Sequence, residues 1–141
     1  MESFDIVNVQ QGISAHVFSV DDSKLLYGEA SREGIPVNRC KLTYICKQGD
    51  KVTGGVFSYA DNIKFESYPF VVQSFKGQGI SEILCNTIIN DYYDLYDVDK
   101  VELRILVSTP MLVSVLERKG LVKSKFKGIG SKWTVLVLER Q

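Results

Sequence analysis

The sequence lacks a net charge, because 17 basic residues balance 17 acidic ones in a chain of 141 residues. Proteins that hold nucleic acid or an anionic membrane surface through their overall field carry an excess of positive charge. Residues 118–132 do contain six basic residues and no acidic one. This stretch predicts a solvated face, or alternatively a local patch for a phosphate or an acidic partner. We therefore do not expect a nucleic-acid partner.

The sequence also has few residues that point to metal binding or nucleophilic catalysis. Cys40, Cys46 and Cys85 form an odd set without a Cys-x-x-Cys pair, which predicts reduced, buried thiols and neither a disulfide framework nor a zinc site. His16 is the only histidine, and we expect it to be structural. The four aspartates within residues 90–100 predict a solvated loop rather than a metal site. No metal is expected.

A long apolar run is missing as well. A membrane-spanning helix needs about 20 consecutive apolar residues, and no stretch of this chain approaches that length. The first five residues lack the basic start and the apolar stretch of a signal peptide. With 45% hydrophobic and 24% charged residues, the composition predicts one globular domain over residues 1–141, located in the cytoplasm and without a membrane partner.

Residues 70–93 form the stretch around which the rest of the chain is organised. An apolar run over residues 70–72 ends in a turn with two glycines, Gly77 and Gly79, and apolar residues then recur at helical spacing. This order predicts a strand, a tight turn and a helix. The first N–H groups of such a helix have no internal partners, and they lie at the positive end of the helix dipole. The turn therefore predicts a phosphate cradle, although an ordinary turn gives the same pattern.

This stretch resembles the signature of the GNAT superfamily of acyl-CoA N-acyltransferases. The family pattern has Gln or Arg, two residues, Gly, one residue, and Gly or Ala. Lys76, Gly79 and Ser81 stand at these places, so only the central glycine matches strictly. The resemblance continues through a strand at residues 101–107 and a helix that opens at Pro110 and closes at Gly120. It extends from about residue 40 to the C-terminus.

The resemblance implies an α/β fold of the α+β type: a mixed, largely antiparallel sheet with helices packed on both faces. Sequence patterns predict strands at residues 4–9, 13–20, 40–46, 52–59, 63–72, 101–107, 122–126 and 132–138. They predict helices at residues 24–32, started by 21–23, at 80–93, and at 110–119, the last with Leu112, Val115 and Leu116 as its core stripe. Pro69 predicts a bulge or a local loss of pairing. The family has a splay between the strands 63–72 and 101–107, where the pantetheine arm lies.

The activity that the resemblance implies is transfer of an acyl group, here expected to be acetyl, from acetyl-CoA to a primary amine. A neutral amine attacks the thioester directly. The expected cofactor-binding residues lie along the strand end, the turn and the two helix starts: Val71, Val72, Lys76, Gly77, Gln78, Gly79, Ile80, Ser81 and Thr109. Backbone N–H groups of residues 78–81 would hold the pyrophosphate, and Lys76 would add a positive charge.

The catalytic residues are less clear in the sequence, because Leu116 stands where many members carry a tyrosine that protonates the leaving thiolate. We expect Leu116→Tyr to have little effect or to give a modest gain. Glu66 is the candidate base, with a place on the solvated face of the sheet as its alternative. Tyr68 and Ser108 are the candidates for the proton donor to the thiolate.

The acceptor is expected to be a small-molecule amine, or a protein lysine or N-terminus. A homodimer is an expected assembly of the protein. The alternative function is a catalytically weak or inactive GNAT-like binding module that acts through protein–protein contacts. Its surfaces would be the basic hairpin of residues 118–132 or the loop of residues 90–100. The absent tyrosine favours this alternative.

Overall fold

The computed structural model describes residues 4–8, 19–107, 110–118, 121–123 and 133–138. Its strands form one seven-stranded sheet in the order β1-β2-β3-β4-β5-β7-β6. The strands are β1 (Phe4–Asn8), β2 (Lys41–Gln48), β3 (Lys51–Ala60), β4 (Lys64–Val71), β5 (Glu102–Val107), β6 (Leu121–Lys123) and β7 (Thr134–Leu138). The helices are α1 (Val20–Arg32), α2 (Ile80–Leu95) and α3 (Pro110–Glu117), and the 3-10 turn η1 spans Gln73–Phe75.

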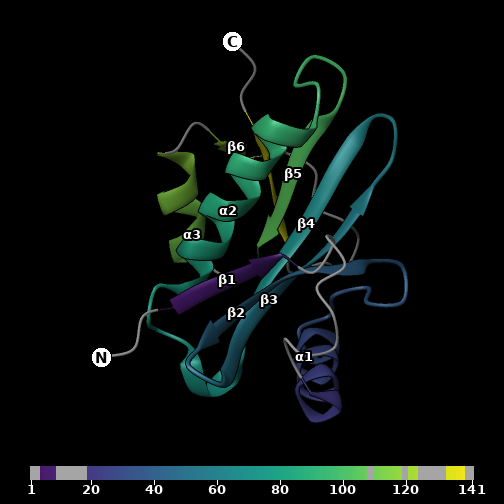
Figure 1. The fold of residues 1–141 in the computed structure, drawn as a ribbon. Coiled ribbons are helices and arrows are strands. Elements are labelled where there is room, and N and C mark those ends of the chain that lie inside the picture. The colour runs from purple at the N-terminus through teal and green to yellow at the C-terminus, as the bar shows by residue number, and fades with distance from the viewer. Residues whose placement is uncertain (1–3, 9–18, 108–109, 119–120, 124–132, 139–141) are drawn as a thin grey trace.

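The sheet is mixed and largely antiparallel. Only β4 and β5 pair in parallel, and the other neighbours pair antiparallel. The parallel pair results from the connection through α2, which crosses one face of the sheet before the chain returns as β5 (Figure 1). A parallel pair requires such a crossover, whereas antiparallel neighbours need only a short turn. The predicted fold class is therefore confirmed.

The two faces of the sheet carry separate hydrophobic clusters. On one face, α2 and α3 cover residues such as Phe65, Leu103 and Leu136, and the two helices lie side by side in Figure 1. On the other face, Leu26 and Ala30 of α1 belong to a cluster with alternate strand residues, among them Phe57, Phe70 and Leu106. Because side chains alternate along a strand, neighbouring residues of β4 and β5 belong to different clusters.

Two adjacent glycines let β3 pack closely against its neighbours. A Cβ atom at Gly54 would lie 2.5 Å from the carbonyl oxygen of Phe70, and one at Gly55 would lie 2.8 Å from that of Tyr44. Both contacts are shorter than atoms tolerate, so a side chain at either position would push the strands apart. The predicted hairpin between β2 and β3 is present, with Gly49 at a φ of 60° in its turn.

Several predicted element boundaries differ from the structure, most clearly those of α1 and α2. Helix α1 begins at Val20 with Ser19 as its cap, because Ser19 and Asp22 form a reciprocal capping box; the strand predicted over 13–20 is wrong at Val20, and residues 13–18 lie outside the described part. Helix α2 continues past residue 93 to Leu95, since Tyr92 donates a hydrogen bond to the carbonyl of Val101 at 2.5 Å. This tertiary contact holds the last turn of α2, although the carboxylates of Asp91 and Asp94 are unfavourable near the C-terminus of a helix.

The core stripe predicted for α3 is confirmed at Leu116, and Val113 is buried as well. Val113 and Leu116 are buried in the cluster beneath α2, whereas the side chains of Leu112 and Val115 lie outside the described part. Residues 124–132 of the basic hairpin and the predicted cofactor-binding residue Thr109 also fall outside it. Cys40, Cys46 and Cys85 are free and buried, as expected.

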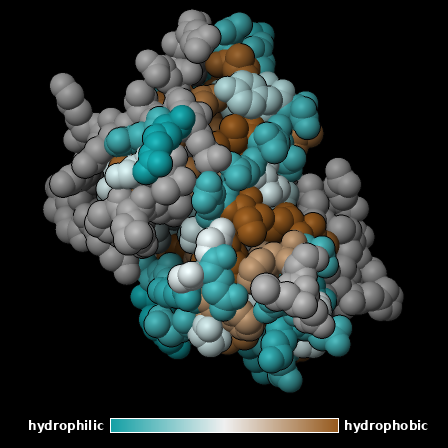
Figure 2. Space-filling model, turned by 90° about the vertical axis from the view of Figure 1, so that its left-hand side faces the viewer, coloured by the Kyte–Doolittle hydropathy of each residue, from teal (hydrophilic) through white to brown (hydrophobic). Residues whose placement is uncertain are grey.

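The described part of the chain contains no helix long and apolar enough to cross a membrane and no group of three His, Cys, Asp or Glu side chains that could hold a metal ion. On the side of the molecule drawn in Figure 2, hydrophobic residues gather in a central patch that polar residues border. This side is therefore neither uniformly polar nor uniformly apolar.

Candidate active site

The start of α2 has the geometry of an anion cradle. Gly77 and Gly79 adopt left-handed backbone angles, with φ of 88° and 78°, which explains why glycine stands at both positions. Gly79 is the N-cap and supplies no side-chain cap. The first helical hydrogen bond runs from the N–H of Ile83 to the carbonyl of Gly79 at 3.3 Å. The N–H groups of Ile80 and Ser81 therefore have no acceptor within the helix.

A hollow of about 240 Å³ opens at this cradle. Six of the nine predicted cofactor-binding residues line it: Val71, Lys76, Gly77, Gly79, Ile80 and Ser81. Val72 does not, because its side chain is buried in the cluster beneath α1 and its N–H donates to the carbonyl of Thr53 at 2.8 Å. Gln78 is exposed and does not line the hollow either. Thr109 lies outside the described residues.

The cation of the cradle already has a partner within the chain. The Nζ atom of Lys76 lies 2.9 Å from Oε1 of Glu33, and both residues line the hollow. Glu33 is the C-cap residue of α1, so this ion pair joins the end of α1 to the start of α2. An incoming phosphate would have to share Lys76 with this carboxylate.

Beside the cradle, β4 and β5 part from one another. Their paired register runs from Lys64 and Glu102 to Ser67 and Ile105, whereas β4 continues to Val71 and β5 to Val107. The predicted splay is therefore present. It begins two residues before Pro69, near the position expected from the sequence.

Pro69 removes pairing on one side of β4 only. The register between β3 and β4 runs without a shift through Val56 and Pro69, so the predicted bulge is absent from that side. The N–H of Val72 points toward β3, and backbone groups alternate sides along an antiparallel ladder. By this alternation the nitrogen of Pro69 faces β5, where proline has no hydrogen to donate. The loss of pairing therefore lies on the β5 side, and the N–H of Val71 points into the splay.

A second hollow, of about 620 Å³, lies on the opposite face of the sheet at the same level. It is lined by Tyr68 and Leu106, the immediate neighbours of Pro69 and Val107, which line the first hollow. Since consecutive strand residues point to opposite faces, the splay lies between the two hollows. A group that enters from the cradle and reaches through the splay would arrive at the second hollow.

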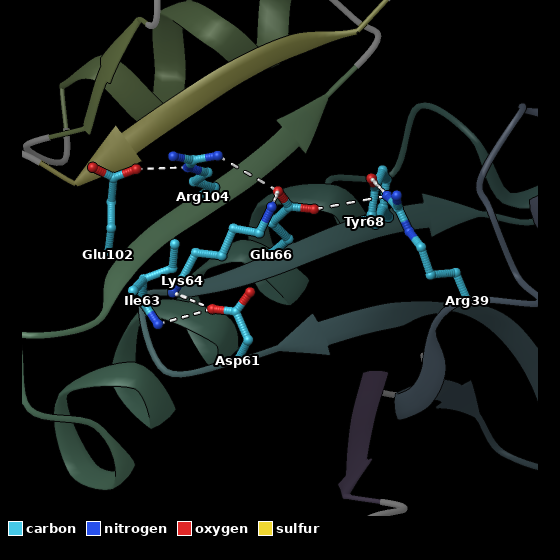
Figure 3. A network of polar contacts seen from close by, with 8 residues as sticks. All are labelled: Arg39, Asp61, Ile63, Lys64, Glu66, Tyr68, Glu102 and Arg104. Carbon is cyan, nitrogen blue, oxygen red and sulfur yellow. Dashed lines mark hydrogen bonds and ion pairs between the residues drawn. The ribbon is translucent and has the colours of Figure 1, made fainter.

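Glu66 lies in this second hollow at the centre of a network of cations (Figure 3). Its Oε1 atom is 3.1 Å from Nζ of Lys64 and 3.6 Å from Nη1 of Arg104, and its Oε2 atom is 3.9 Å from Nη2 of Arg39. Glu66 is only 8% exposed, so the solvated-face interpretation is wrong. Of the two carboxylate oxygens of Glu66, Oε2 lies farther from its nearest cation among the described residues, at 3.9 Å against 3.1 Å for Oε1.

Tyr68 lies next to Glu66 on the same face. Its hydroxyl accepts a hydrogen bond from Nη2 of Arg39 at 3.3 Å, and its ring meets Trp133 edge-on, with 5.7 Å between the ring centroids. Burial raises the pKa of the Tyr68 hydroxyl, the charge of Glu66 raises it further, and Arg39 opposes both effects. Tyr68 therefore keeps its proton at neutral pH and can donate it.

Leu116 cannot serve as the proton donor that the absent tyrosine would supply. Its side chain is fully buried in the cluster beneath α2 and lines neither hollow. Ser108, the other predicted proton donor, lies outside the described residues.

Sequence reasoning missed Arg39, Arg104 and Glu33. Arg104 could have been found, because it pairs with Glu66 in the β4–β5 register and both strands were predicted. Arg39 precedes β2 and reaches a residue 29 positions away, so no local pattern indicates its contact. The same holds for Glu33 at the end of α1, which the sequence does not connect to the turn at Lys76.

Solved structures share the fold over nearly the whole chain, whereas no family model and no curated protein matches the sequence. A GNAT family acetyltransferase from Elizabethkingia anophelis with acetyl-CoA bound is 16% identical, with a TM-score of 0.64 and coverage of 99% of this chain and 100% of that one. An IAA acetyltransferase from Bacillus cereus ATCC 14579 is 16% identical, with a TM-score of 0.65 and coverage of 98% and 100%. The chain has the GNAT fold.

A more distant similarity supports the same GNAT fold. The PaiA N-acetyltransferase from Thermoplasma acidophilum, in complex with coenzyme A, is 10% identical, with a TM-score of 0.59 and coverage of 98% of this chain and 99% of that one. Identities of 10 to 16% establish the GNAT fold alone. The reaction has to be argued from the residues of the two hollows.

Proposed function

We propose that the protein is an acyl-CoA-dependent N-acyltransferase that transfers an acetyl group from acetyl-CoA to a primary amine. The observation that carries the proposal is the splay between β4 and β5, which joins an anion cradle on one face to a charged hollow on the other. Structures with the same fold contain acetyl-CoA or coenzyme A, which supports acetyl-CoA as the donor.

In this proposal the cradle binds the pyrophosphate. The N–H groups of residues 78–81 donate to phosphate oxygens at the positive end of the α2 dipole, and Lys76 adds its charge. The pantetheine arm follows the splay, where the N–H of Val71 has no β5 partner among the described residues and can bond to an amide oxygen. Val107 lines the same hollow and supplies an apolar wall.

The amine enters from the second hollow and attacks the thioester carbonyl as a neutral nucleophile. The C–N bond forms and the C–S bond breaks through a tetrahedral intermediate, so one proton leaves the nitrogen and one reaches the thiolate. Glu66 accepts the first through Oε2, directly or through a water molecule. Tyr68 donates the second, or Ser108 does so. Most of the rate then comes from positioning, with proton transfer contributing about 10²- to 10⁴-fold.

Two measurements test the proposal: calorimetric titration with acetyl-CoA, and thiol release from acetyl-CoA with a panel of polyamines, amino acids, aminoglycosides and lysine-containing proteins. Gly79→Glu identifies the site, because it places a side chain and a negative charge in the cradle. A Cβ at Gly79 meets no atom within 4 Å, so the folded state is strained by about 1–2 kcal/mol through its φ but is not blocked. Gly79→Ala is the matched control for this strain. Equal affinity of the Glu and Ala variants would place the site elsewhere.

A second function is favoured by the burial of Leu116, which leaves α3 without a proton donor at the usual position. In that case the protein binds acyl-CoA, or retains only the outline of the cradle, and acts through contacts with another protein. Acetyl-CoA binding without thiol release for any acceptor would support this module. The cytoplasmic location, the single domain and the homodimer remain predictions from the sequence.

A further inference from the structure

The second hollow combines an apolar wall with a charged rim. Leu106, Val135 and Val137 lie along β5 and β7 on the face of α1, and Tyr68 adds its ring. Glu66, Glu102, Arg39 and Arg104 supply the charges. Such a hollow suits an acceptor with an apolar body and a charged group that fixes its orientation.

Most of these charges are paired at short range. Nε of Arg104 lies 2.6 Å from Oε1 of Glu102, and Oε1 of Glu66 lies 3.1 Å from Lys64. Close pairs of this kind leave little capacity for a ligand, because their donors and acceptors already satisfy one another.

Arg39 differs from the other cations of the hollow. Among the described residues its nearest carboxylate oxygen is Oε2 of Glu66, 3.9 Å away, and its hydrogen bond goes to the neutral hydroxyl of Tyr68. The guanidinium lies 5.9 Å from the centre of the Tyr59 ring, so an aromatic face and a hydroxyl orient it. Its side chain is 57% exposed. A guanidinium has five N–H donors, and this one is held in place while retaining donors for a planar anion.

We propose that the acceptor is an amine that carries a carboxylate on an apolar body, as an apolar amino acid does, and that Arg39 binds this carboxylate. The inference rests on the proposed acyl transfer. Binding through the carboxylate would direct the amine toward Glu66 and the splay, and the cations beside it would favour the neutral form of the amine that attacks the thioester. An amine without a carboxylate would lose this contact.

The test compares two acceptors that differ only in the carboxylate, L-phenylalanine and 2-phenylethylamine. Acetylation of each is followed by thiol release from acetyl-CoA, and the quantity compared is the ratio of their kcat/KM values. One charge-assisted contact corresponds to about tenfold or more, so we expect the parent to prefer phenylalanine by at least that factor. Leucine and 3-methylbutylamine form a second pair with an aliphatic body.

Arg39→Gln should reduce this preference by about tenfold or more, mainly by raising the KM for phenylalanine. Arg39→Lys should retain part of the preference, because it keeps the charge and loses the fork. Arg32→Gln is the matched control: Arg32 is an exposed arginine that pairs with Glu29 on α1 and lines neither hollow, and it should keep the parent ratio. Circular dichroism checks that each variant is folded.

The outcomes separate the inference from the proposed function. Transfer to both amines with no preference for phenylalanine, or a preference that Arg39→Gln leaves intact, would overturn the inference and leave acyl transfer standing. Absence of transfer to every amine of the panel would overturn both. A preference that falls with Arg39→Gln and persists with Arg32→Gln supports the assignment.

Discussion

Nζ of Lys76 and Oε1 of Glu33 are 2.9 Å apart at the mouth of the cradle. The carboxylate of Glu33 therefore occupies a position beside Lys76 that the proposed phosphate ligand would also use. The pair links the end of α1 to the turn that precedes α2, and these two helices lie on opposite faces of the sheet. The negative charge of Glu33 opposes an incoming anion and also holds the cation that would bind it.

Glu33→Gln should therefore increase the affinity for acetyl-CoA. The Lys76 side chain is 47% exposed, and pairs at such positions are worth about 0.2–1 kcal/mol, which corresponds to a gain of about 1.4- to fivefold. The gain should shrink as salt is added, because screening weakens the same interaction. Calorimetry at two ionic strengths measures it. Glu117→Gln, an exposed change on α3, serves as the control, and a loss of affinity in Glu33→Gln would contradict the prediction.

Glu66→Gln should lower turnover at neutral pH by at least about tenfold and leave the affinity for acetyl-CoA nearly unchanged, as expected for loss of a general base. The substitution keeps the size of a side chain that is almost buried and removes its charge from among Lys64, Arg39 and Arg104. Thiol release and calorimetry measure the two effects. Glu102→Gln, which breaks only the pair with Arg104, should lower turnover by less than about threefold. Unchanged turnover in Glu66→Gln would eliminate Glu66 as the base.

Leu116→Tyr should destabilise the fold without a gain in activity. The sequence alone predicts little effect or a modest gain, but Leu116 is fully buried against α2, and overpacking a filled core costs about 1–3 kcal/mol. Urea denaturation measures the change in the free energy of unfolding. Ser114→Tyr adds the same ring at an exposed position of α3 and should be nearly neutral. A Leu116→Tyr variant with unchanged stability and faster turnover would show that this position reaches the site.

The cysteines should react slowly in the folded protein and within seconds after unfolding in urea. Burial raises the pKa of Cys40, with Arg39 opposing it, and burial also raises the pKa of Cys46. The thiols of the unfolded chain therefore lose their protons at a lower pH than those of the folded protein. The stability that the buried neutral thiols contribute is complete below the unfolded thiol pKa of about 8.5, and it is lost as pH rises through the folded pKa values. Timed labelling with a thiol reagent measures the reactivity of the cysteines, and urea titrations between pH 7 and 10 measure how the free energy of unfolding changes with pH. Labelling of all three thiols within seconds under native conditions would sink the prediction.

The parts of the site that lie close in the sequence could be predicted, and the parts assembled by tertiary contacts could not. Gly77 and Gly79 with the apolar residues after them indicate the strand, turn and helix, because each feature has a local cause. The place of Arg39 beside Tyr68, 29 residues away, depends on how the segment before β2 lies over the sheet. The pairing of Glu33 with Lys76 depends on where α1 ends. Periodicity also left out Val113, which is buried on α3, because a helix of 8 residues gives too few repeats to define the whole buried face.

The seam between β4 and β5 has only four residue pairs, from Lys64 and Glu102 to Ser67 and Ile105. Beyond them, the alternation along β4 directs the amide hydrogen of Val71 toward β5, with which no further pairing is found among the described residues, whereas that of Val72 is bonded to Thr53. Adjacent amides at the end of β4 thus differ in protection from deuterium exchange. Val71 should exchange quickly in the free protein and more slowly once a ligand arm fills the gap, with Val72 as an internal reference. The exchange rate of the Val71 amide, compared with that of Val72, therefore reports whether a ligand fills the gap between β4 and β5, and no label has to be attached to the protein.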